Sequence, residues 1–453
     1  MIHDRGYASD MHDDLLLAVN DLFPSLRTRL EELIRIPSVS AAGYDAGEVR
    51  RSAEITAQMM RASGLNEVRL LDLEGAHPAV YGEIAGPKGS PTVLLYAHHD
   101  VQPPGPAGEW TTDAFEPAER EGRLYGRGSS DDKAGIVIHL GALEAFGEYP
   151  PVGIKVLIEG EEEIGSPHLG KFLSAYDTLL AADVIVIADV GNIETGKPSL
   201  TTSLRGLVDC EVEVRTLTHA IHSGHAGGAA PDALIVLARI LATLHDDSGN
   251  VTIDGLIRRD TEKIMTETWW RKSLGVIDNV ELLGEDSIES KLWMQPAISV
   301  LAIDAPSTSE AINQLVPIAR AKISMRIAPG ENPEQAMISL ATHLENAAPW
   351  GAHVKVTPGS TGDAFELDTS SLAYKAFSKA FSIAWGTETS FIGSGGSIPF
   401  VAAFSKQFPD ASILLTGVSD HMSNTHAPDE SVDLEDLRKA VVAEALALRL
   451  LAI

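Results

Sequence analysis

Short apolar runs of strand length recur in the first and last parts of the chain, and segments with helical spacing separate several of them. The apolar runs are Thr92–Tyr96, Gly153–Ile158, Asp183–Ala188 and Ser412–Thr416. Helical spacing covers Leu15–Ile36, about Val49–Ser63 and Ala134–Phe146. Continuous apolar strands that alternate with helices are typical of a buried, largely parallel sheet. The pattern therefore predicts an α/β layer.

The middle of the chain has a different pattern, in which apolar and polar residues alternate. This alternation is typical of half-buried strands. It covers Leu207–Val214, Lys322–Ala328 and Ala352–Thr357, with helical runs between them at Pro231–Leu244 and Pro333–Asn346. We therefore predict a smaller α+β domain, residues 204–357, inserted into an α/β domain formed by residues 1–203 and 358–453. The polar stretch 246–289 has no assignable pattern.

Length and composition agree with two domains of a globular protein. The chain has 453 residues, of which 44% are hydrophobic, and this is too long for one ordinary core. No run of 18 or more apolar residues occurs, so we expect no membrane-spanning helix. The polar, acidic N-terminal segment predicts no secretory signal. Cys210 is the single cysteine, which excludes an internal disulfide and favours a cytoplasmic location.

The net charge restricts the partners of the protein. With 64 acidic against 35 basic residues, the formal charge is −29. Such a chain repels nucleic acids and anionic membranes, because phosphate binding requires clustered lysines and arginines. We expect neither as a partner. Most of the acidic residues have an ordinary role in solubility.

Some of the charged and imidazole side chains stand directly after the apolar runs. The first run leads into His98 and Asp100, the second into the sequence EGEEEIGS from Glu159, and the third into Asp189. The last run is followed by His421 and His426, and Asp131 and Asp132 directly precede a predicted helix. In open α/β sheets, ligands bind at the carboxyl ends of the strands.

Imidazoles and carboxylates that converge from separate segments suit a divalent metal ion. Each feature alone has an ordinary explanation, such as a solvated acidic loop or a helix N-cap. Several carboxylates in one cleft are destabilising unless cations accompany them. Three carboxylate ligands against two divalent ions leave a charge of +1, which a bridging hydroxide cancels. The combination therefore predicts a metal site.

Five motifs occur in the order found in the M20 metallopeptidases. They are YAHHDVQP from Tyr96, GRGSSDDKAG from Gly126, EGEEEIGS, IADVGN from Ile187 and THAPDE from Thr425. HSGHAGG from His222 and GGSIP from Gly395 make the chain resemble the carnosinase-like cytosolic dipeptidases of that family. The resemblance covers nearly the whole chain. It implies a catalytic domain of the zinc-peptidase type with an inserted domain that forms a lid and pairs two subunits.

The resemblance implies two divalent metal ions per subunit. Zinc is the ion that we expect, and manganese is the alternative. Asp131 would bridge both ions, and the other ligands would be His98, Glu163, Asp189 and His426. His421 is a competing candidate, but the HAPDE spacing favours His426.

The resemblance also assigns the residues that act on water. Glu162 would be the general base, and Glu159 and Glu161 would be supporting or solvated. Asp100 would orient His98 and make its imidazole more basic. The peptide bond between Asp131 and Asp132 would be cis.

In the inserted domain, the resemblance implies residues that act on the substrate. His222 would reach the active site of the partner subunit in a homodimer formed through residues 204–357. Arg326 would bind the free carboxylate of the substrate, for which a guanidinium is well suited. Gly396 and Ser397 would line the same side of the pocket.

Some positions depart from the family pattern. Asp429 replaces the usual asparagine three residues after the last ligand histidine. Gly393 and Ser394 stand where several eukaryotic carnosinase-like enzymes carry arginine and glutamate, which weakens the case for carnosine itself as the substrate.

The function implied is hydrolysis of dipeptides or short peptides with a free C-terminal carboxylate, by a hydroxide shared between two ions. The nearest alternative is an N-acyl amino acid deacylase or a carboxypeptidase of the same family. A metal-binding dimer without catalysis is a second alternative, although no base or ligand is missing. Two-metal phosphoester hydrolysis is a third, and the lack of an arginine or lysine cluster counts against it.

Overall fold

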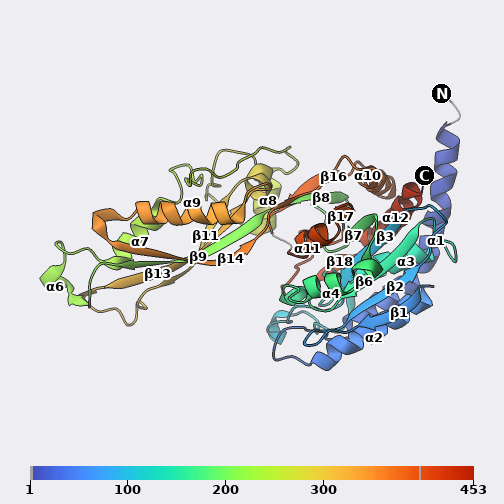
Figure 1. Ribbon diagram of the computed structural model, residues 1–453, viewed down its shortest axis with the longest axis horizontal. Helices are drawn as coiled ribbons and strands as arrows, with labels where there is room; N and C mark the ends of the chain where they lie inside the picture. The colour runs from blue at the N-terminus through green and yellow to red at the C-terminus, as the bar shows by residue number, and fades with distance from the viewer. Residues whose placement is uncertain (1–3, 397–398, 453) are drawn as a thin grey trace. The chain divides into compact units, whose positions relative to one another are not determined.

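The computed structural model describes residues 4–396 and 399–452, which form two compact units (Figure 1). The first unit holds the chain up to Thr202, residues 367–392 and the segment from Pro399 on. The second unit holds residues 203–366 and 393–396. The inserted segment of the second unit thus runs to Glu366, and a short piece near Ser394 joins it. The roles of catalytic domain and lid stay predictions.

The main sheet of the first unit is parallel in its middle and antiparallel at its edges. Its strand order is β1-β2-β6-β3-β7-β17-β8, and β6, β3, β7 and β17 run parallel to one another. The bounds are β1 Asn66–Leu71, β2 Ala79–Ile84, β3 Thr92–His98, β6 Gly153–Glu159, β7 Val184–Ile187, β8 Ser199–Leu204 and β17 Ser412–Leu415. The four parallel strands are the four apolar runs identified in the sequence. They are buried on both faces, which explains why they lack alternation.

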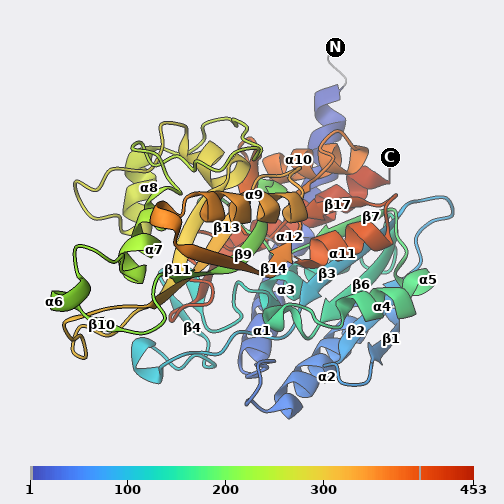
Figure 2. The same ribbon diagram turned by 60° about the vertical axis from the view of Figure 1, so that its left-hand side comes forward.

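Helices cover both faces of this sheet (Figures 1 and 2). On one face, α1, α3 and α12 contact one another, and on the other α4 contacts α11. Their bounds are α1 Asp4–Ile34, α3 Lys133–Glu144, α4 Leu169–Ala175, α11 Pro399–Gln407 and α12 Leu434–Leu451. The unit also contains α2 Ala46–Ala62 beside β1 and β2, α10 Leu372–Trp385 against α12, and the short α5 Asp177–Leu180.

A small antiparallel sheet joins two loops of the first unit. Its strand order is β18-β5-β4, with β4 Ala118–Arg120, β5 Arg123–Tyr125 and β18 Ser431–Asp433. Ser431 pairs with Tyr125. The loop that follows β5 therefore lies beside the loop that precedes β18.

The second unit is an antiparallel sheet with helices on one face. The strand order is β11-β13-β9-β14, with β9 Gly206–Arg215, β11 Ala297–Asp304, β13 Ile318–Ile327 and β14 His353–Gly362. Helices α7 Ala233–Ala242 and α9 Pro333–Asn346 pack on it and bury every second residue of β9 and β13. This one-sided burial is the cause of the alternation in the sequence. Helix α8 Glu267–Leu274 and loops fill most of the stretch 246–289.

The predicted fold class, an α/β sheet with an inserted α+β domain, is confirmed. The antiparallel edge strands are an addition that the apolar runs did not reveal. Among the described residues, no helix is long and apolar enough to cross a membrane.

Candidate metal centre

The candidate site lies at the carboxyl ends of the parallel strands. His98 is the last residue of β3, Asp189 follows β7, and Glu162 and Glu163 lie in a 3-10 turn shortly after β6. Because β6, β3 and β7 are neighbours in the sheet, their ends deliver these side chains to one place. Asp131 reaches the same place from the loop before α3.

Among the described residues, two groups of three side chains have the spacing of a metal site, and they share one residue. His98, Asp131 and Asp189 form the first group, and Asp131, Glu163 and His426 form the second; within each group the ligand atoms lie within 4.8 Å of one another. Asp131 Oδ1 lies 3.1 Å from His98 Nε2, and Asp131 Oδ2 lies 3.0 Å from His426 Nε2. His98 Nε2 is 3.6 Å from Asp189 Oδ1, and His426 Nε2 is 3.2 Å from Glu163 Oε2. Asp131 thus faces both groups, one with each oxygen.

The peptide bond between Asp131 and Asp132 is cis, as the resemblance implied. His426 has a backbone φ of 64°, in the left-handed region that few side chains other than glycine adopt. His426 lies against Asp131 and Glu163, although its side chain is 58% exposed. The candidate metal-binding groups among the described residues include His426 and not His421.

Asp100 connects the histidine of the first group to the acidic turn. Its carboxylate is buried and lies 3.3 Å from His98 Nδ1. It also accepts hydrogen bonds from the backbone N–H groups of Glu162, at 3.2 Å, and Glu163, at 3.1 Å. One carboxylate therefore orients an imidazole and places both acidic residues of the turn.

The four acidic residues of EGEEEIGS have separate surroundings. Glu159 and Glu161 are each only 2% exposed. The Tyr96 hydroxyl donates to Glu159 at 2.6 Å, and the backbone N–H of His77 donates to Glu161 at 2.8 Å. Both are thus supporting residues and neither is solvated. Glu162 belongs to neither group of three, and its Oε2 lies 3.9 Å from His98 Nε2.

Burial and mutual repulsion make this cluster electrostatically unfavourable without cations. Burial, together with the charge of Asp189, raises the pKa of Glu162 to about 9. Burial and Asp131 raise the pKa of Glu163 to about 7. The neighbouring carboxylates of Asp131 and Glu163 raise the pKa of His426 to about 10. These shifts indicate a site that lacks positive charge.

The donor set fits divalent cations. Imidazole nitrogens and carboxylate oxygens are ligands for zinc and manganese. The ligand carboxylates Asp131, Glu163 and Asp189 carry three negative charges when ionised, which bound cations would balance. The fold already holds the side chain of Glu163 in place, because Gln102 donates its backbone and side-chain N–H groups to the Glu163 carboxylate at 3.0 and 2.9 Å.

The residues predicted to act on the substrate lie in the second unit. His222 is exposed at the end of β10 Ile221–His222, and its Nδ1 accepts a hydrogen bond from the Gly224 N–H at 3.0 Å. Arg326 is half-buried on β13, and burial lowers the pKa of its guanidinium. Within the described part of the chain, no carboxylate forms an ion pair with Arg326. The Gly396 N–H donates to Ser394 Oγ at 3.3 Å, and Ser397 lies outside the described residues.

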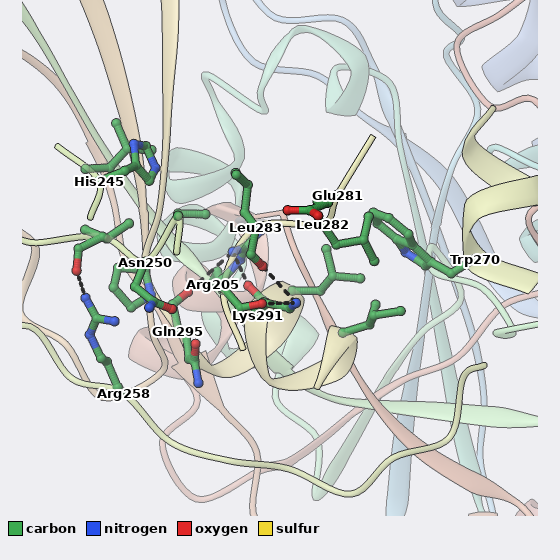
Figure 3. Close-up of a pocket in the computed structure, with 18 of the residues that line it drawn as sticks. Arg205, His245, Asn250, Arg258, Trp270, Glu281, Leu282, Leu283, Lys291 and Gln295 are labelled. Atoms are coloured by element: carbon green, nitrogen blue, oxygen red, sulfur yellow. Dashed lines mark hydrogen bonds between the residues drawn. The ribbon is translucent and has the colours of Figure 1, made fainter. Parts of the chain in front are cut away.

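A pocket of about 380 Å³ in the second unit has a different character (Figure 3). Apolar side chains such as Trp270 and Leu283 form much of its wall. The cations that line it bond to backbone carbonyls: Lys291 Nζ donates to Leu283 O at 2.8 Å, and Arg205 donates to Lys291 O at 3.1 Å. It includes none of the predicted catalytic or metal-binding residues, so it adds nothing to the chemistry of the metal centre.

Two residues that support the site were not foreseen. Gln102 holds Glu163, and Ser40 Oγ donates to Asp100 at 2.6 Å. Gln102 lies inside the YAHHDVQP motif, four residues after His98, and this proximity was a usable signal. Ser40 follows a helix far from the motif, and nothing local marks it.

Comparison with known proteins agrees with this geometry. The sequence pattern of peptidase family M20/M25/M40 matches residues 94–449. The chain belongs to this family. This M20 chain is 36% identical over 426 residues to a cysteinylglycine-S-conjugate dipeptidase of Corynebacterium striatum, covering 92% of this chain and 93% of that protein.

Two solved structures extend the comparison to the fold. The human carnosine dipeptidase 1 is 24% identical, with a TM-score of 0.78 over 98% of this M20 chain and 99% of that chain. An M20 family metallo-carboxypeptidase of Sulfolobus solfataricus is 26% identical, also with a TM-score of 0.78, over 94% and 99% of the two chains.

These findings confirm the predicted family, its dipeptidase subgroup and the enzyme class, a metallopeptidase that hydrolyses peptide bonds.

Proposed function

We propose that this M20 chain is a two-metal dipeptidase that acts on dipeptides with a free C-terminal carboxylate. The observation that supports this most is the position of Asp131, whose two oxygens face separate groups of ligands. A carboxylate shared in this way suits a pair of ions. His98 and Asp189 would complete one ion's protein ligands, and Glu163 and His426 those of the other.

Zinc is the proposed ion, and manganese suits the same ligands. When bound, such ions lower the pKa of a water molecule toward 7 and polarise the scissile carbonyl.

Glu162 is the proposed general base and acid. It is the one carboxylate of the turn that lies near His98 but outside both groups of three. Its carboxylate would take the proton from the attacking water and then give it to the leaving amine. Asp100 would fix the position of His98 relative to the acidic turn through the contacts described above.

The second unit would provide the contacts with the substrate. Arg326 has no carboxylate partner within the described residues, which leaves its guanidinium available for the substrate carboxylate. Gly396 and Ser397 would lie beside it. His222, which is exposed, would reach the partner's active site and stabilise the oxyanion.

A homodimer through residues 204–357 is part of the proposal. Strand β11 is an edge strand of the second unit, and Val300, Leu301 and Ile303 on it are 42–60% exposed. An exposed apolar edge strand is a surface that a second copy of the chain would cover. Sedimentation velocity of the wild type and of a Leu301→Lys variant would test it: loss of a dimer in the variant supports this surface, and a monomeric wild type contradicts it.

The substrate class proposed first is a cysteinylglycine-like dipeptide, as the name of the Corynebacterium relative suggests. A carboxypeptidase activity is the second candidate, because the Sulfolobus relative bears that name and is similar over almost the whole chain. A deacylase of the same family is the remaining one. A cytoplasmic location is also proposed, since a lone cysteine suits a reducing compartment.

The deciding experiment is hydrolysis by metal-stripped protein with Zn²⁺ or Mn²⁺ added back. The panel contains cysteinylglycine, β-alanylhistidine, longer peptides and N-acetyl amino acids. Metal-dependent cleavage of free dipeptides alone supports the proposal. Cleavage of longer peptides from the C-terminus favours the carboxypeptidase, and cleavage of only acylated amino acids favours the deacylase. Inactivity with two ions bound would contradict all three.

A further inference from the structure

Glu430 ends the loop that carries His426, and it is fully buried. The next residue, Ser431, begins β18 and pairs with Tyr125 at the end of β5. The backbone N–H of Gly126 donates to Glu430 O at 2.9 Å. The pairing of two short strands therefore places Glu430 against the loop 126–131, which carries Asp131.

The carboxylate of Glu430 accepts hydrogen bonds along almost the whole of this loop. Oε2 accepts from Arg127 Nη1 at 2.6 Å and from Gly128 N at 3.0 Å. Oε1 accepts from Ser130 N at 3.0 Å and Ser130 Oγ at 3.2 Å. It also accepts from the backbone N–H of Asp131 itself, at 3.2 Å.

Burying a carboxylate is costly unless its oxygens are paired and hydrogen-bonded. The guanidinium of Arg127, which is 1% exposed, balances the charge of Glu430, and three backbone N–H groups satisfy its remaining lone pairs. Because these N–H groups are consecutive or nearly so, the carboxylate fixes the course of the backbone and not only one side chain.

The backbone position of Asp131 decides where its side chain points. One of its oxygens must meet His98 and the other His426, each at about hydrogen-bond distance. A small shift of the loop would break one of these contacts and keep the other. Glu430 also lies on the same loop as His426, so it joins the two segments that bring ligands to the second group.

We infer that Glu430 is a positioning residue that fixes Asp131 between the two groups of ligands and thereby sets the affinity of the site for its cations. The inference rests on the metal site proposed above. Glu430 belongs to neither group of candidate ligands.

The neighbouring carboxylate offers a matched control. Asp429 accepts from Thr111 N at 3.0 Å, Thr111 Oγ1 at 2.6 Å and Arg120 Nη2 at 3.1 Å. It bonds to none of the residues 126–131. Asp429→Asn therefore makes the same change of carboxylate to amide, one residue away, without touching the loop of Asp131.

The test compares full-length Glu430→Gln, Asp429→Asn and wild type. Glutamine has nearly the same shape, but its NH₂ group would face N–H donors on one side, and the pairing with Arg127 is lost. In metal-free protein, we expect faster hydrogen–deuterium exchange in peptides covering 126–133 for Glu430→Gln only. In zinc titrations against a competing chelator, we expect its affinity to fall about 10- to 100-fold, and that of Asp429→Asn to stay within about threefold.

A folded Glu430→Gln with wild-type exchange and wild-type zinc affinity would overturn the inference. A lower melting temperature with unchanged zinc affinity would also overturn it, because it would show a merely structural role. If Glu430→Gln does not fold, Glu430→Asp keeps the charge and retracts the carboxylate by one methylene; weaker zinc binding supports the inference, and wild-type binding overturns it. If wild type binds neither zinc nor manganese, the proposed function fails, while the exchange comparison still decides whether Glu430 holds the loop.

Discussion

The first unit buries some of its ion pairs completely, whereas each ion pair between described residues of the second unit keeps at least one side chain 39% or more exposed. In the first unit, Arg127 and Glu430 are 1% and 0% exposed. In the second, Arg259 and Glu366 are 40% and 49% exposed. Surface pairs contribute little to stability, whereas removing one partner of a buried pair leaves a charge that nothing balances.

The same contrast separates the residues predicted from the motifs. His98 is fully buried, and four carboxylates of the first unit lie within 3.9 Å of its ring nitrogens, those of Asp100, Asp131, Glu162 and Asp189. His222 is exposed, and Arg326 has no carboxylate partner among the described residues. The difference teaches that the candidate metal centre is built within one unit, while the second unit presents side chains whose proposed partners are a substrate and a second subunit.

The largest expected effect concerns the acidic turn. We expect Glu162→Ala to keep its metal content and to lose about 10²- to 10⁴-fold in kcat, the range for a general base. Elemental analysis and dipeptide hydrolysis measure the two quantities. Glu161→Gln changes the adjacent carboxylate, which bonds to His77 and His168. The Glu161→Gln variant should lose about 1–3 kcal/mol of stability and keep its kcat within a few-fold of wild type. A normal rate in Glu162→Ala would exclude Glu162 as the general base.

Removal of metal should affect the two units unequally. Without cations, the carboxylates of the first unit repel one another. By mass action, each ion at a free concentration of 100 times its dissociation constant should stabilise the unit by about 2.7 kcal/mol, and two independently bound ions by about 5.4 kcal/mol. Calorimetry with zinc and with a chelator measures the shift. Hydrogen exchange should slow in residues 98–100, 126–135 and 159–166 on adding zinc, and stay unchanged in β9 and β13. Equal slowing in both units would contradict a centre built within the first.

In the second unit, Arg326→Ala should raise KM roughly 10- to 100-fold, because a charged hydrogen bond is worth about 1.5–3 kcal/mol. Zinc affinity should not change. The control is Arg320→Ala, on the same strand and the same face, where Glu213 already pairs with the guanidinium. A KM effect of equal size in both variants would indicate a general disturbance of β13.

The smallest effect is a pH dependence of the buried ion pair between α3 and α12. His139 Nδ1 lies 2.8 Å from Glu444 Oε1, and Nε2 lies 3.0 Å from Tyr96 O, so only the doubly protonated ring donates to both. Burial opposes this charge, but Glu444 raises the pKa of His139. The charged ring therefore stabilises the fold fully at pH values below the pKa of His139 in the unfolded chain. This stabilisation is lost as the pH rises through the higher pKa of His139 in the folded protein.

Urea unfolding at pH 6 and pH 9 should show this loss. The difference in unfolding free energy between wild type and His139→Gln should be larger at pH 6, by about 1–2 kcal/mol. Glu213→Gln in the second unit provides the comparison. Because the partners of Glu213 are exposed, this substitution should lower the unfolding free energy by less than about 1 kcal/mol at either pH. A pH-independent difference for His139→Gln would mean that the ring is neutral.

The sequence predicted the parallel strands of the first unit, but it did not predict the short strands that pair two of its loops. The strands β3, β6, β7 and β17 were predictable because a buried parallel strand is apolar along its whole length, which is a local property. Strands β4, β5 and β18 have only three residues each and no periodicity. They exist because distant segments pair, and no window of the sequence contains that information.

Most of the candidate ligands could be predicted because they stand close to a strand or helix whose pattern is visible, whereas His426 lies in the loop between β17 and β18 and was selected by its motif. His98, Asp131 and Asp189 are examples, and the family motifs select among the neighbouring acids. The contacts of Ser40 and Glu430 could not be predicted in this way. Glu430 bonds to Gly128 across 302 residues of sequence, and only the pairing of β5 with β18 brings them together.

By itself, the sequence determined the alternation of strands and helices, the inserted domain, the family and the residue types of the metal centre, because these depend on local periodicity and on ordered motifs. The tertiary structure decided which carboxylate faces both imidazoles, which glutamates of the acidic turn are buried supports, and which residues hold the loops in place. These properties depend on distances between atoms far apart in the chain, and those distances exist only once the parallel strands and the small sheet have formed.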